Sequence, residues 1–242
     1  MPRQNPLAPD ATFAQLWEVA DRIKGWLTRD QAQLLHDEAT RLAPGSVALE
    51  IGSHQGRSTV VLAHALRARD ASLIAMDPFV EGRLFGGSPT RAIFERNLRD
   101  AAVEDVVELI PEYSTRARPT WNRPLDLLYI DGKHDYWTLS DDLKWARHLP
   151  EDSVVLIHDC FSSIGVTLGI LRHVLFSDDL AYESRATSLA LFRRRRVTPR
   201  DRLRLIAQLP WWIRNVGIKV LLRLRLRFVA RALGHDSPYD PY

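Results

Sequence analysis

The chain has 242 residues, of which 45% are hydrophobic and 26% are charged, and Cys160 is its only cysteine. A chain of this size can bury one sizeable core, and a single cysteine excludes a disulfide framework and a cysteine-rich zinc site. The net charge of +3 is unevenly distributed, because residues 193–231 carry 12 Arg and one Lys against one acid and the remainder is therefore acidic.

The N-terminal sequence "MPRQNPLAPD" has no apolar leader region, so we expect a cytoplasmic protein. The strong excess of Arg over Lys is typical of a GC-rich genome, such as an actinobacterial one. Apolar residues at helical spacing then predict two helices within residues 12–26 and 28–43, each after a threonine that can cap it.

Short apolar runs alternate with helical segments from residue 46 onward. The first strand, 46–52, precedes a helix at 56–68, and the pattern repeats until an alternating hairpin at 180–195. Continuous apolar strands separated by helices require a parallel sheet covered on both faces. We therefore predict an α/β fold with a doubly wound, mostly parallel seven-stranded sheet. The predicted regions are N-terminal helices (1–43), a core (44–196) and a basic amphipathic extension (197–242).

The stretch "ALEIGSHQGRST", residues 48–59, is the turn from the first strand into its helix. Gly52 and Gly56 allow a ligand to approach the backbone, and the helix start with Ser58 and Thr59 offers donors to an anionic group. Ligands bind at such strand ends in doubly wound sheets. An ordinary glycine-containing turn is the alternative.

Acids lie at the ends of two consecutive predicted strands, and they distinguish this loop from a dinucleotide-binding loop. Glu50 precedes Gly52, whereas His54 takes the place of the middle glycine of a pyrophosphate-binding fingerprint. An acid here favours a ligand with an ammonium group and one carboxylate, such as the methionine part of S-adenosylmethionine. Asp77 ends the next strand, where a carboxylate can bind ribose hydroxyls.

The chain here resembles the class I S-adenosylmethionine-dependent methyltransferases over about residues 40 to 195. More narrowly, 49–59 and 127–159 resemble the bacterial macrocin-type and rhamnosyl O-methyltransferases and the cephalosporin hydroxylase-like proteins. The resemblance implies a methionine end held by Glu50, Gly52 and Ser58, and ribose held by Asp77. It also implies Ser114 near the adenine, and we predict Ser53, Gly56 and Asp131 as further donor-binding residues.

Polar residues end two later apolar strands. Asp131 is followed by His134, and His158 by Asp159. Because neighbouring strand ends converge, these residues predict an oxygen-rich site for a hard divalent cation, with Mg²⁺ favoured. Catechol-type enzymes, which the chain resembles more distantly, have an aspartate ligand here, a lysine base three residues later and an Asp-Asn pair. That resemblance implies Asp131 and Asp159 as ligands, with His158 as ligand, base or supporting donor.

The histidines set the predicted chemistry. An imidazole ligand at His158 would admit Mn²⁺ or Co²⁺ more readily. His134 is the expected base that removes the acceptor proton, and His158 is the second candidate. In the structural alternative, Asp131 caps the next helix and Asp159 satisfies a loop. The nearby acids Asp135, Asp141 and Asp142 are expected at the surface. The tryptophans Trp137 and Trp145 are expected in the core.

Residues 79–91 form a glycine-rich, aromatic segment after the ribose strand. This segment is either a mobile flap over the acceptor, with Phe79, Arg83 and Phe85 near the sugar, or an ordinary surface loop.

The tail mixes Arg with Leu, Ile and Trp, and it has no uncharged apolar run long enough to span a membrane. We expect peripheral contact with anionic lipid at the inner face of the membrane. Docking on the acidic body or in a homodimer is the alternative, and nucleic acid is not expected.

Three functions remain after this reading. The leading one is a metal-dependent O-methyltransferase acting on a sugar, glycoside or polysaccharide precursor, including antibiotic glycosides and actinobacterial methylated polysaccharides or glycolipids. The others are a hydroxylase-like oxidoreductase on the same fold and a noncatalytic membrane-attached binding protein.

Overall fold

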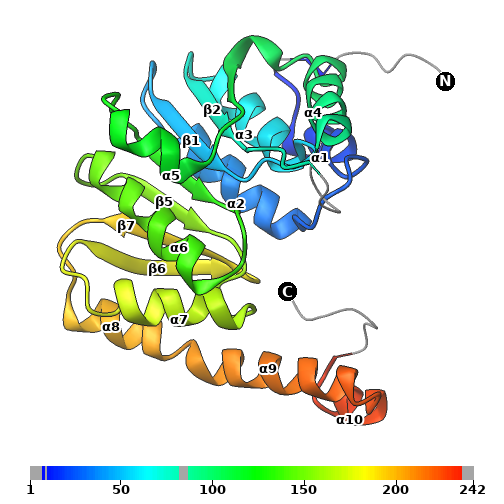
Figure 1. The fold of residues 1–242 in the computed structure, drawn as a ribbon, viewed down its shortest axis with the longest axis vertical. Helices are drawn as coiled ribbons and strands as arrows, with labels where there is room; N and C mark the ends of the chain where they lie inside the picture. Colours follow the sequence, from blue (N-terminus) through cyan, green and yellow to red (C-terminus); the bar gives the residue numbers. More distant parts are fainter. Residues whose placement is uncertain (1–6, 9, 82–86, 236–242) are drawn as a thin grey trace.

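The protein is built on one seven-stranded sheet (Figure 1). The computed structural model describes residues 7–8, 10–81 and 87–235. The strand order is β3-β2-β1-β4-β5-β7-β6. β1 to β5 are parallel, and β7 pairs antiparallel with both β5 and β6. The predicted doubly wound, mostly parallel sheet is thus confirmed. The strands are β1 (Val47–Ile51), β2 (Ser72–Met76), β3 (Val107–Ile110), β4 (Leu127–Ile130), β5 (Val154–Ile157), β6 (Leu180–Ala186) and β7 (Leu189–Arg194).

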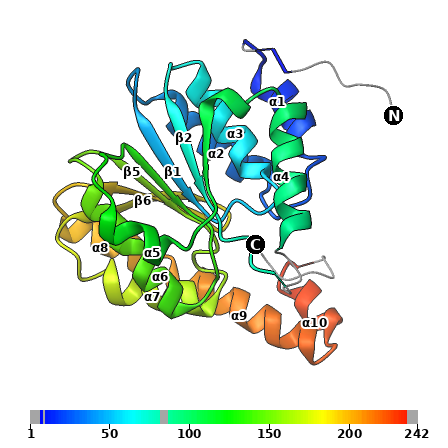
Figure 2. The ribbon, with the colours of Figure 1, turned by 45° about the horizontal axis from the view of Figure 1, so that its top comes forward.

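Helices cover both faces of the sheet (Figure 2). One hydrophobic cluster joins a sheet face to the first four helices, and a second joins the other face to later helices. The first set is α1 (Phe13–Ala20), α2 (Arg29–Thr40), α3 (Arg57–Arg67) and α4 (Ser88–Asp100). The later elements up to β6 are α6 (Tyr136–Asp142) and α7 (Ile164–His173), with the short α5 (Ser114–Ala117) and the 3-10 turns Glu104–Val106, Arg118–Thr120 and Leu143–His148.

The central strands are buried because side chains from both of their faces enter a core. In β1, Ala48 packs in the first cluster, whereas Leu49 and Ile51 pack in the second. This two-sided burial explains why the strands read as continuous apolar runs. Sheet order reverses between β1 and β4, the position at which a doubly wound sheet leaves a crevice for ligands.

The N-terminal helices begin where the threonines predicted. Thr12 and Thr28 each form a capping box with a glutamine three residues later. Such boxes satisfy backbone N–H groups that have no partner inside the helix. Gln31 of α2 also donates to Ser188 Oγ in the β6–β7 turn (3.0 Å), so this helix is linked to the hairpin.

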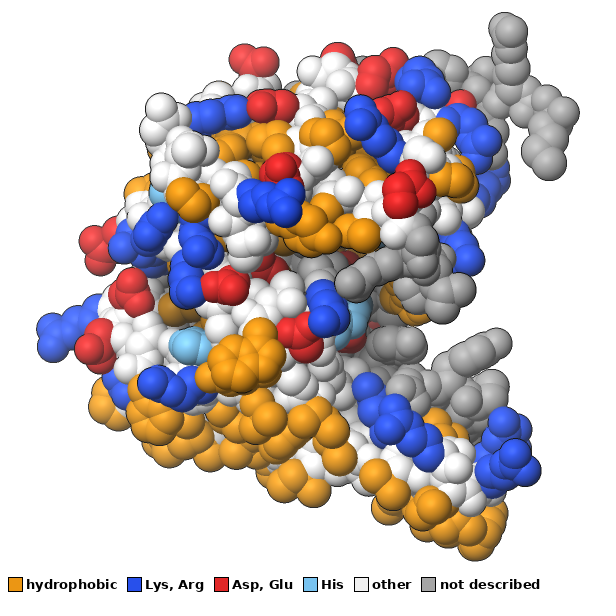
Figure 3. Space-filling view, in the orientation of Figure 1, with side chains coloured by type: hydrophobic (Ala, Val, Ile, Leu, Met, Phe, Trp, Pro, Cys, Tyr) orange, Lys and Arg blue, Asp and Glu red, His pale blue; other side chains and the backbone are white. Residues whose placement is uncertain are grey.

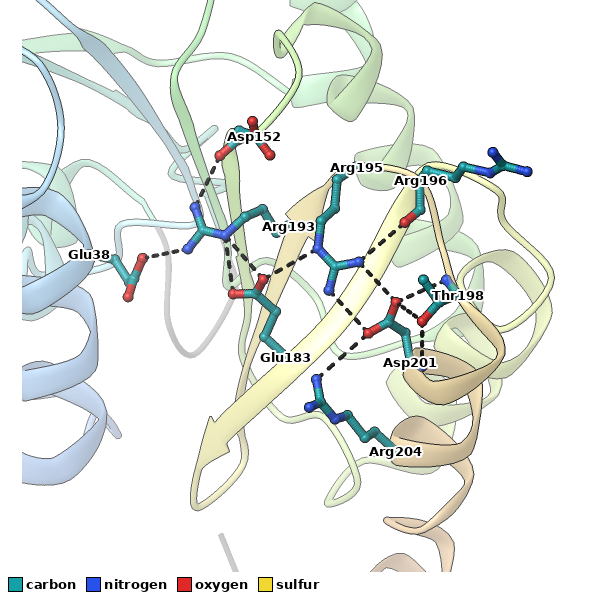
Figure 4. A network of polar contacts seen from close by, with 9 residues as sticks. All are labelled: Glu38, Asp152, Glu183, Arg193, Arg195, Arg196, Thr198, Asp201 and Arg204. Atoms are coloured by element: carbon teal, nitrogen blue, oxygen red, sulfur yellow. Dashed lines mark hydrogen bonds and ion pairs between the residues drawn. The ribbon is translucent and has the colours of Figure 1, made fainter.

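Up to residue 235, three helices follow the sheet: α8 (Pro199–Ile206), α9 (Leu209–Arg223) and α10 (Arg227–Ala232). Figure 4 shows how the first is fixed to the body. Arg195, just after β7, donates to both oxygens of Asp201 at 2.9 and 3.1 Å, and Asp201 closes the capping box of α8 with Thr198. In the described part of the chain, none of the helices combines the length and apolar character needed to cross a bilayer.

Candidate functional site

A cavity of about 1120 Å³ lies at the carboxyl ends of the central strands. Ile51 is in register with Met76 and with Ile130, and Ile130 is in register with Ile157. The next residue of each strand therefore lies in one row across the sheet end. This row is Gly52, Asp77, Asp131 and His158, and all four residues line the cavity.

Gly52 sits where the β1 loop meets the end of β4. Its φ is +90°, and a Cβ at this position would lie 2.3 Å from the carbonyl oxygen of Asp131. Only glycine fits this left-handed, closely packed position without displacing the neighbouring strand. The loop and the β4 end are thus held in contact by backbone packing.

Glu50 supports this loop from behind the cavity wall. Its carboxylate is fully buried and accepts from Ser58 Oγ and Thr59 Oγ1, each at 2.5 Å. Burial, partly opposed by these hydrogen bonds, raises the pKa of Glu50 to about 7. Glu50 and Gly56 lie outside the cavity lining, which contains Gly52, Ser53 and Ser58. Glu50 therefore fixes the start of α3, and its expected contact with the methionine end of the donor stays a prediction.

Asp77 holds the other side of the same loop. Its Oδ2 accepts from the backbone N–H groups of Ser53 and His54, both at 3.0 Å, and its Oδ1 accepts from the N–H of Phe79 at 2.8 Å. Each carboxylate oxygen can accept more than one hydrogen bond. Asp77 is therefore oriented by the chain and retains acceptor capacity toward the cavity.

A second buried acid lies near the start of α5. Ser114 Oγ donates to Asp142 Oδ1 at 2.5 Å, and both residues line the cavity. Asp142 is 1% exposed, and burial raises its pKa to about 6. The expectation that Asp142 faces solvent is wrong, because the inner face of α6 turns toward the β4 loop. Asp135 does lie at the start of α6, where it caps the helix by accepting from the N–H of Thr138.

Two histidines and two aspartates form a compact cluster after β4 and β5. His158 Nδ1 lies 3.1 Å from Asp131 Oδ1, and His134 Nε2 lies 3.3 Å from the same oxygen. His134 Nδ1 lies 2.7 Å from Asp159 Oδ2. The strand ends thus bring together all four residues that the sequence singled out.

The charges in this cluster stabilise one another. Burial lowers the pKa of His134, but its hydrogen bonds and attraction to Asp131 and Asp159 outweigh this effect and raise the pKa to about 10. Burial also opposes ionisation of Asp131, whereas His158 and His134 hold its pKa well below the usual range. His134 is accordingly protonated at neutral pH in this arrangement.

Two residues absent from the sequence predictions orient the cluster. Tyr129 Oη donates to Asp131 Oδ2 at 2.9 Å, and Gln31 Oε1 lies 3.3 Å from His158 Nε2. The contact of Tyr129 could have been predicted from the sequence, because it lies two residues before Asp131 and side chains two apart along a strand lie on the same face. The contact of Gln31 could not have been predicted, because Gln31 comes from a helix more than a hundred residues earlier in the chain.

The cluster fits a divalent cation. Ligand atoms of Asp131, His134 and His158 all lie within 4.8 Å of one another. Mixed imidazole and carboxylate donors suit Mn²⁺, Co²⁺ or Zn²⁺ as well as Mg²⁺. The predicted set had Asp159 in place of His134, whereas in the structure Asp159 contacts His134 and lies outside this three-residue set.

The cavity wall also receives residues from outside the row of strand ends. Lys219 and Arg223 of α9 line it, as does the 77% exposed Trp137 of α6. The expectation of a core position is therefore wrong for Trp137 and confirmed for Trp145, which is fully buried. Phe79 packs against Phe94 in the core instead of facing the acceptor, and Arg83 and Phe85 lie outside the described residues.

Comparison with known proteins matches the same part of the chain. Residues 49–160, which include the β1 loop and the strand ends with the cluster, match the protein family described as methyltransferase domain.

Solved structures share the fold at low sequence identity. An O-methyltransferase from Bacillus cereus in complex with SAH is 16% identical, with a TM-score of 0.54, and the match covers 77% of this chain and 91% of that one. An SAH-bound methyltransferase from Podospora anserina, PaMTH1, is 16% identical, with a TM-score of 0.59, and the match covers 78% of this chain and 89% of that one. The O-methyltransferase NovP is 18% identical, with a TM-score of 0.54, and the match covers 71% of this chain and 84% of that one.

Proposed function

We propose that this chain, which has the Rossmann-like methyltransferase fold, transfers a methyl group from S-adenosylmethionine to a hydroxyl of a sugar, glycoside or polysaccharide precursor, with the help of a divalent cation. The observation that carries the proposal is the row of strand ends. It puts the glycine loop and Asp77 in the same cavity as the Asp131, His134 and His158 cluster.

The donor half is built for a molecule of mixed charge. Gly52 and Ser53 present backbone beside the start of α3, which favours a carboxylate. Asp77 is held so that an oxygen can accept from ribose hydroxyls. Ser114 and Asp142 lie beyond it and suit the amino group of an adenine, because Asp142 is a buried acceptor at the cavity wall.

Methyl transfer to oxygen needs an aligned acceptor and the removal of its proton. A divalent cation held by Asp131, His134 or His158 would lower the pKa of a bound hydroxyl and supply positive charge to the acidic cluster. Asp131 and Asp159 orient His134, and Tyr129 and Gln31 hold Asp131 and His158. His134 is our candidate base, with His158 as the alternative; the histidine that is not a ligand acts, and the positive charge of the bound cation would lower its pKa so that it is neutral and able to accept the proton.

Donor binding is tested first, by calorimetry with S-adenosylmethionine and, separately, with NAD. We expect S-adenosylmethionine to bind and NAD not to bind. Binding of NAD without S-adenosylmethionine would contradict the proposal and favour an oxidoreductase.

Acceptor chemistry is tested by transfer of tritiated methyl from S-adenosylmethionine onto a panel of saccharides, with and without Mg²⁺, Mn²⁺ or Co²⁺. We expect transfer that a chelator abolishes and an added divalent ion restores. Full activity in chelator would remove the cation from the proposal and leave the donor site standing.

A further inference from the structure

The helices after the sheet expose an apolar stripe. We define the stripe by six exposed apolar residues spaced three, four or seven positions apart in α8, in α9 and its C-cap, and in α10: Leu203, Ile206, Ile213, Val220, Leu224 and Phe228. Within α8 and within α9 these intervals keep the paired side chains on one helical face. Exposed fractions reach 66% at Leu203, 65% at Ile213 and 70% at Phe228, and Figure 3 shows apolar side chains along this lower edge of the molecule. Exposed apolar side chains gathered along one edge are typical of an interaction site.

The opposite face of α9 is fixed to the body. Asn215 is fully buried and donates to the carbonyl of Phe161 at 3.1 Å, and Ile218 is fully buried as well. At the other end of the extension, Arg195 holds Asp201 of α8 (Figure 4). The helices therefore present the stripe outward from an ordered base, and they do not use it to pack against the protein's own core.

Arginines flank the stripe almost without opposition. Asp201 is the single acid between residues 196 and 235, and Arg195 already occupies both its oxygens. The exposed arginines along these helices are Arg200, Arg204, Arg223, Arg225, Arg227 and Arg231. A second copy of this surface would bring arginines against arginines. A sheet of anionic headgroups above an apolar layer complements both the stripe and its charge.

We propose that α8, α9 and α10 dock the protein on an anionic lipid surface through this stripe and its flanking arginines. The same helix α9 contributes Lys219 and Arg223 to the cavity wall. Docking would therefore hold one edge of the cavity near the lipid headgroups. The inference is independent of methyl transfer, because it concerns a surface outside the donor row.

Vesicle binding of the full chain tests the proposal. We expect cosedimentation with phosphatidylglycerol-containing vesicles, none with pure phosphatidylcholine vesicles, and weakening at high salt. Arg225→Glu with Arg227→Glu should lower the affinity about tenfold or more, since each basic residue near such a surface contributes about 1 kcal/mol. The matched control is Arg96→Glu with Arg99→Glu, which makes the same charge change on exposed positions of α4.

Insertion of the stripe is tested with a fluorescent label. Because Cys160 is buried and burial raises the pKa of its thiol, an Ile213→Cys substitution provides the only readily labelled cysteine. A polarity-sensitive dye there should shift to the blue on addition of anionic vesicles, and the same dye at Arg96→Cys should not.

Three results would overturn the proposal. One is the absence of binding to anionic vesicles at low salt. Another is equal loss of binding in the α4 control, which would show a dependence on net charge alone. The third is a stable dimer in solution, without lipid affinity, that Ile213→Gln with Leu224→Gln converts to a monomer. Circular dichroism of each variant checks that its helices remain folded.

Discussion

The two halves of the cavity, the proposed donor half around the β1 loop and the proposed cation half around Asp131, are built in different ways. In the donor half, the chain's own groups hold two carboxylates of the β1 loop region: Ser58 and Thr59 bind Glu50 behind the cavity wall, and three backbone N–H groups bind Asp77. In the cation half, Asp131, His134, His158 and Asp159 mostly contact one another.

The donor half therefore depends on fixed geometry, whereas the cation half depends on the balance of charge among its residues. The donor half is preorganised by hydrogen bonds that need no ligand, so its variants should alter folding and donor affinity together. The cation half is a set of ionisable groups whose pKa values depend on one another, so its variants should alter metal affinity and turnover while donor affinity stays nearly constant.

The largest effect is expected for Asp159→Ala in the cation half. Loss of the carboxylate that contacts His134 should lower methyl transfer by about a thousandfold, or 4 kcal/mol, and weaken Mn²⁺ binding. Calorimetry should show donor affinity within about threefold of wild type. Asp178→Ala, at an exposed acid, is the control. A matching loss of donor affinity would break the division into two halves.

Gly52→Ala should disturb both halves. The new Cβ must displace the Asp131 backbone and adopt a positive φ, at a cost of about 3 kcal/mol in the free energy of unfolding, with weaker donor binding. Gly45→Ala also places alanine at a positive φ but has no atom within 4 Å of its Cβ, so it should cost about 1 kcal/mol and spare donor binding. Urea denaturation and calorimetry measure both, and equal costs would contradict the steric argument.

Glu50 gives the donor half a pH signature. Since its pKa in the fold, about 7, lies above the ordinary 4.5, the fold binds this proton more tightly than the unfolded chain does. The stabilisation is complete below pH 4.5, declines as pH rises and is lost above 7, a change of about 3 kcal/mol. Glu50→Gln should remove this component from unfolding curves between pH 5 and 8. An unchanged pH dependence would show that Glu50 does not titrate there.

The smallest effect is expected at Gln31, which supports the cation half from α2. Gln31→Leu removes the partner of His158 Nε2 and should weaken Mn²⁺ binding about tenfold. Gln31→Glu keeps an oxygen for His158 and for the cap of α2, so it should restore most of that affinity. If the leucine variant binds Mn²⁺ normally, Gln31 has only a structural role.

Much of the architecture follows from local sequence patterns. Continuous apolar strands alternating with amphipathic helices predicted the sheet, and Thr12 and Thr28 predicted two helix starts, because burial and capping act over a few residues. The placement of Asp131, His134, His158 and Asp159 at adjacent strand ends was also predictable, since parallel strands end at one edge of a sheet.

The side-chain partners were decided by the tertiary structure. Glu50 turned behind the loop toward Ser58 and Thr59, Asp142 turned inward, and Trp137 stayed outside, because helix rotation and loop path depend on packing that no short segment encodes. Gln31 reaches His158 and Lys219 reaches the cavity wall from segments near opposite ends of the chain. The sequence by itself determined which strands are followed by ionisable residues. Only the fold determined which distant helices contribute to the site, since contacts between remote segments arise from the shape of the whole core.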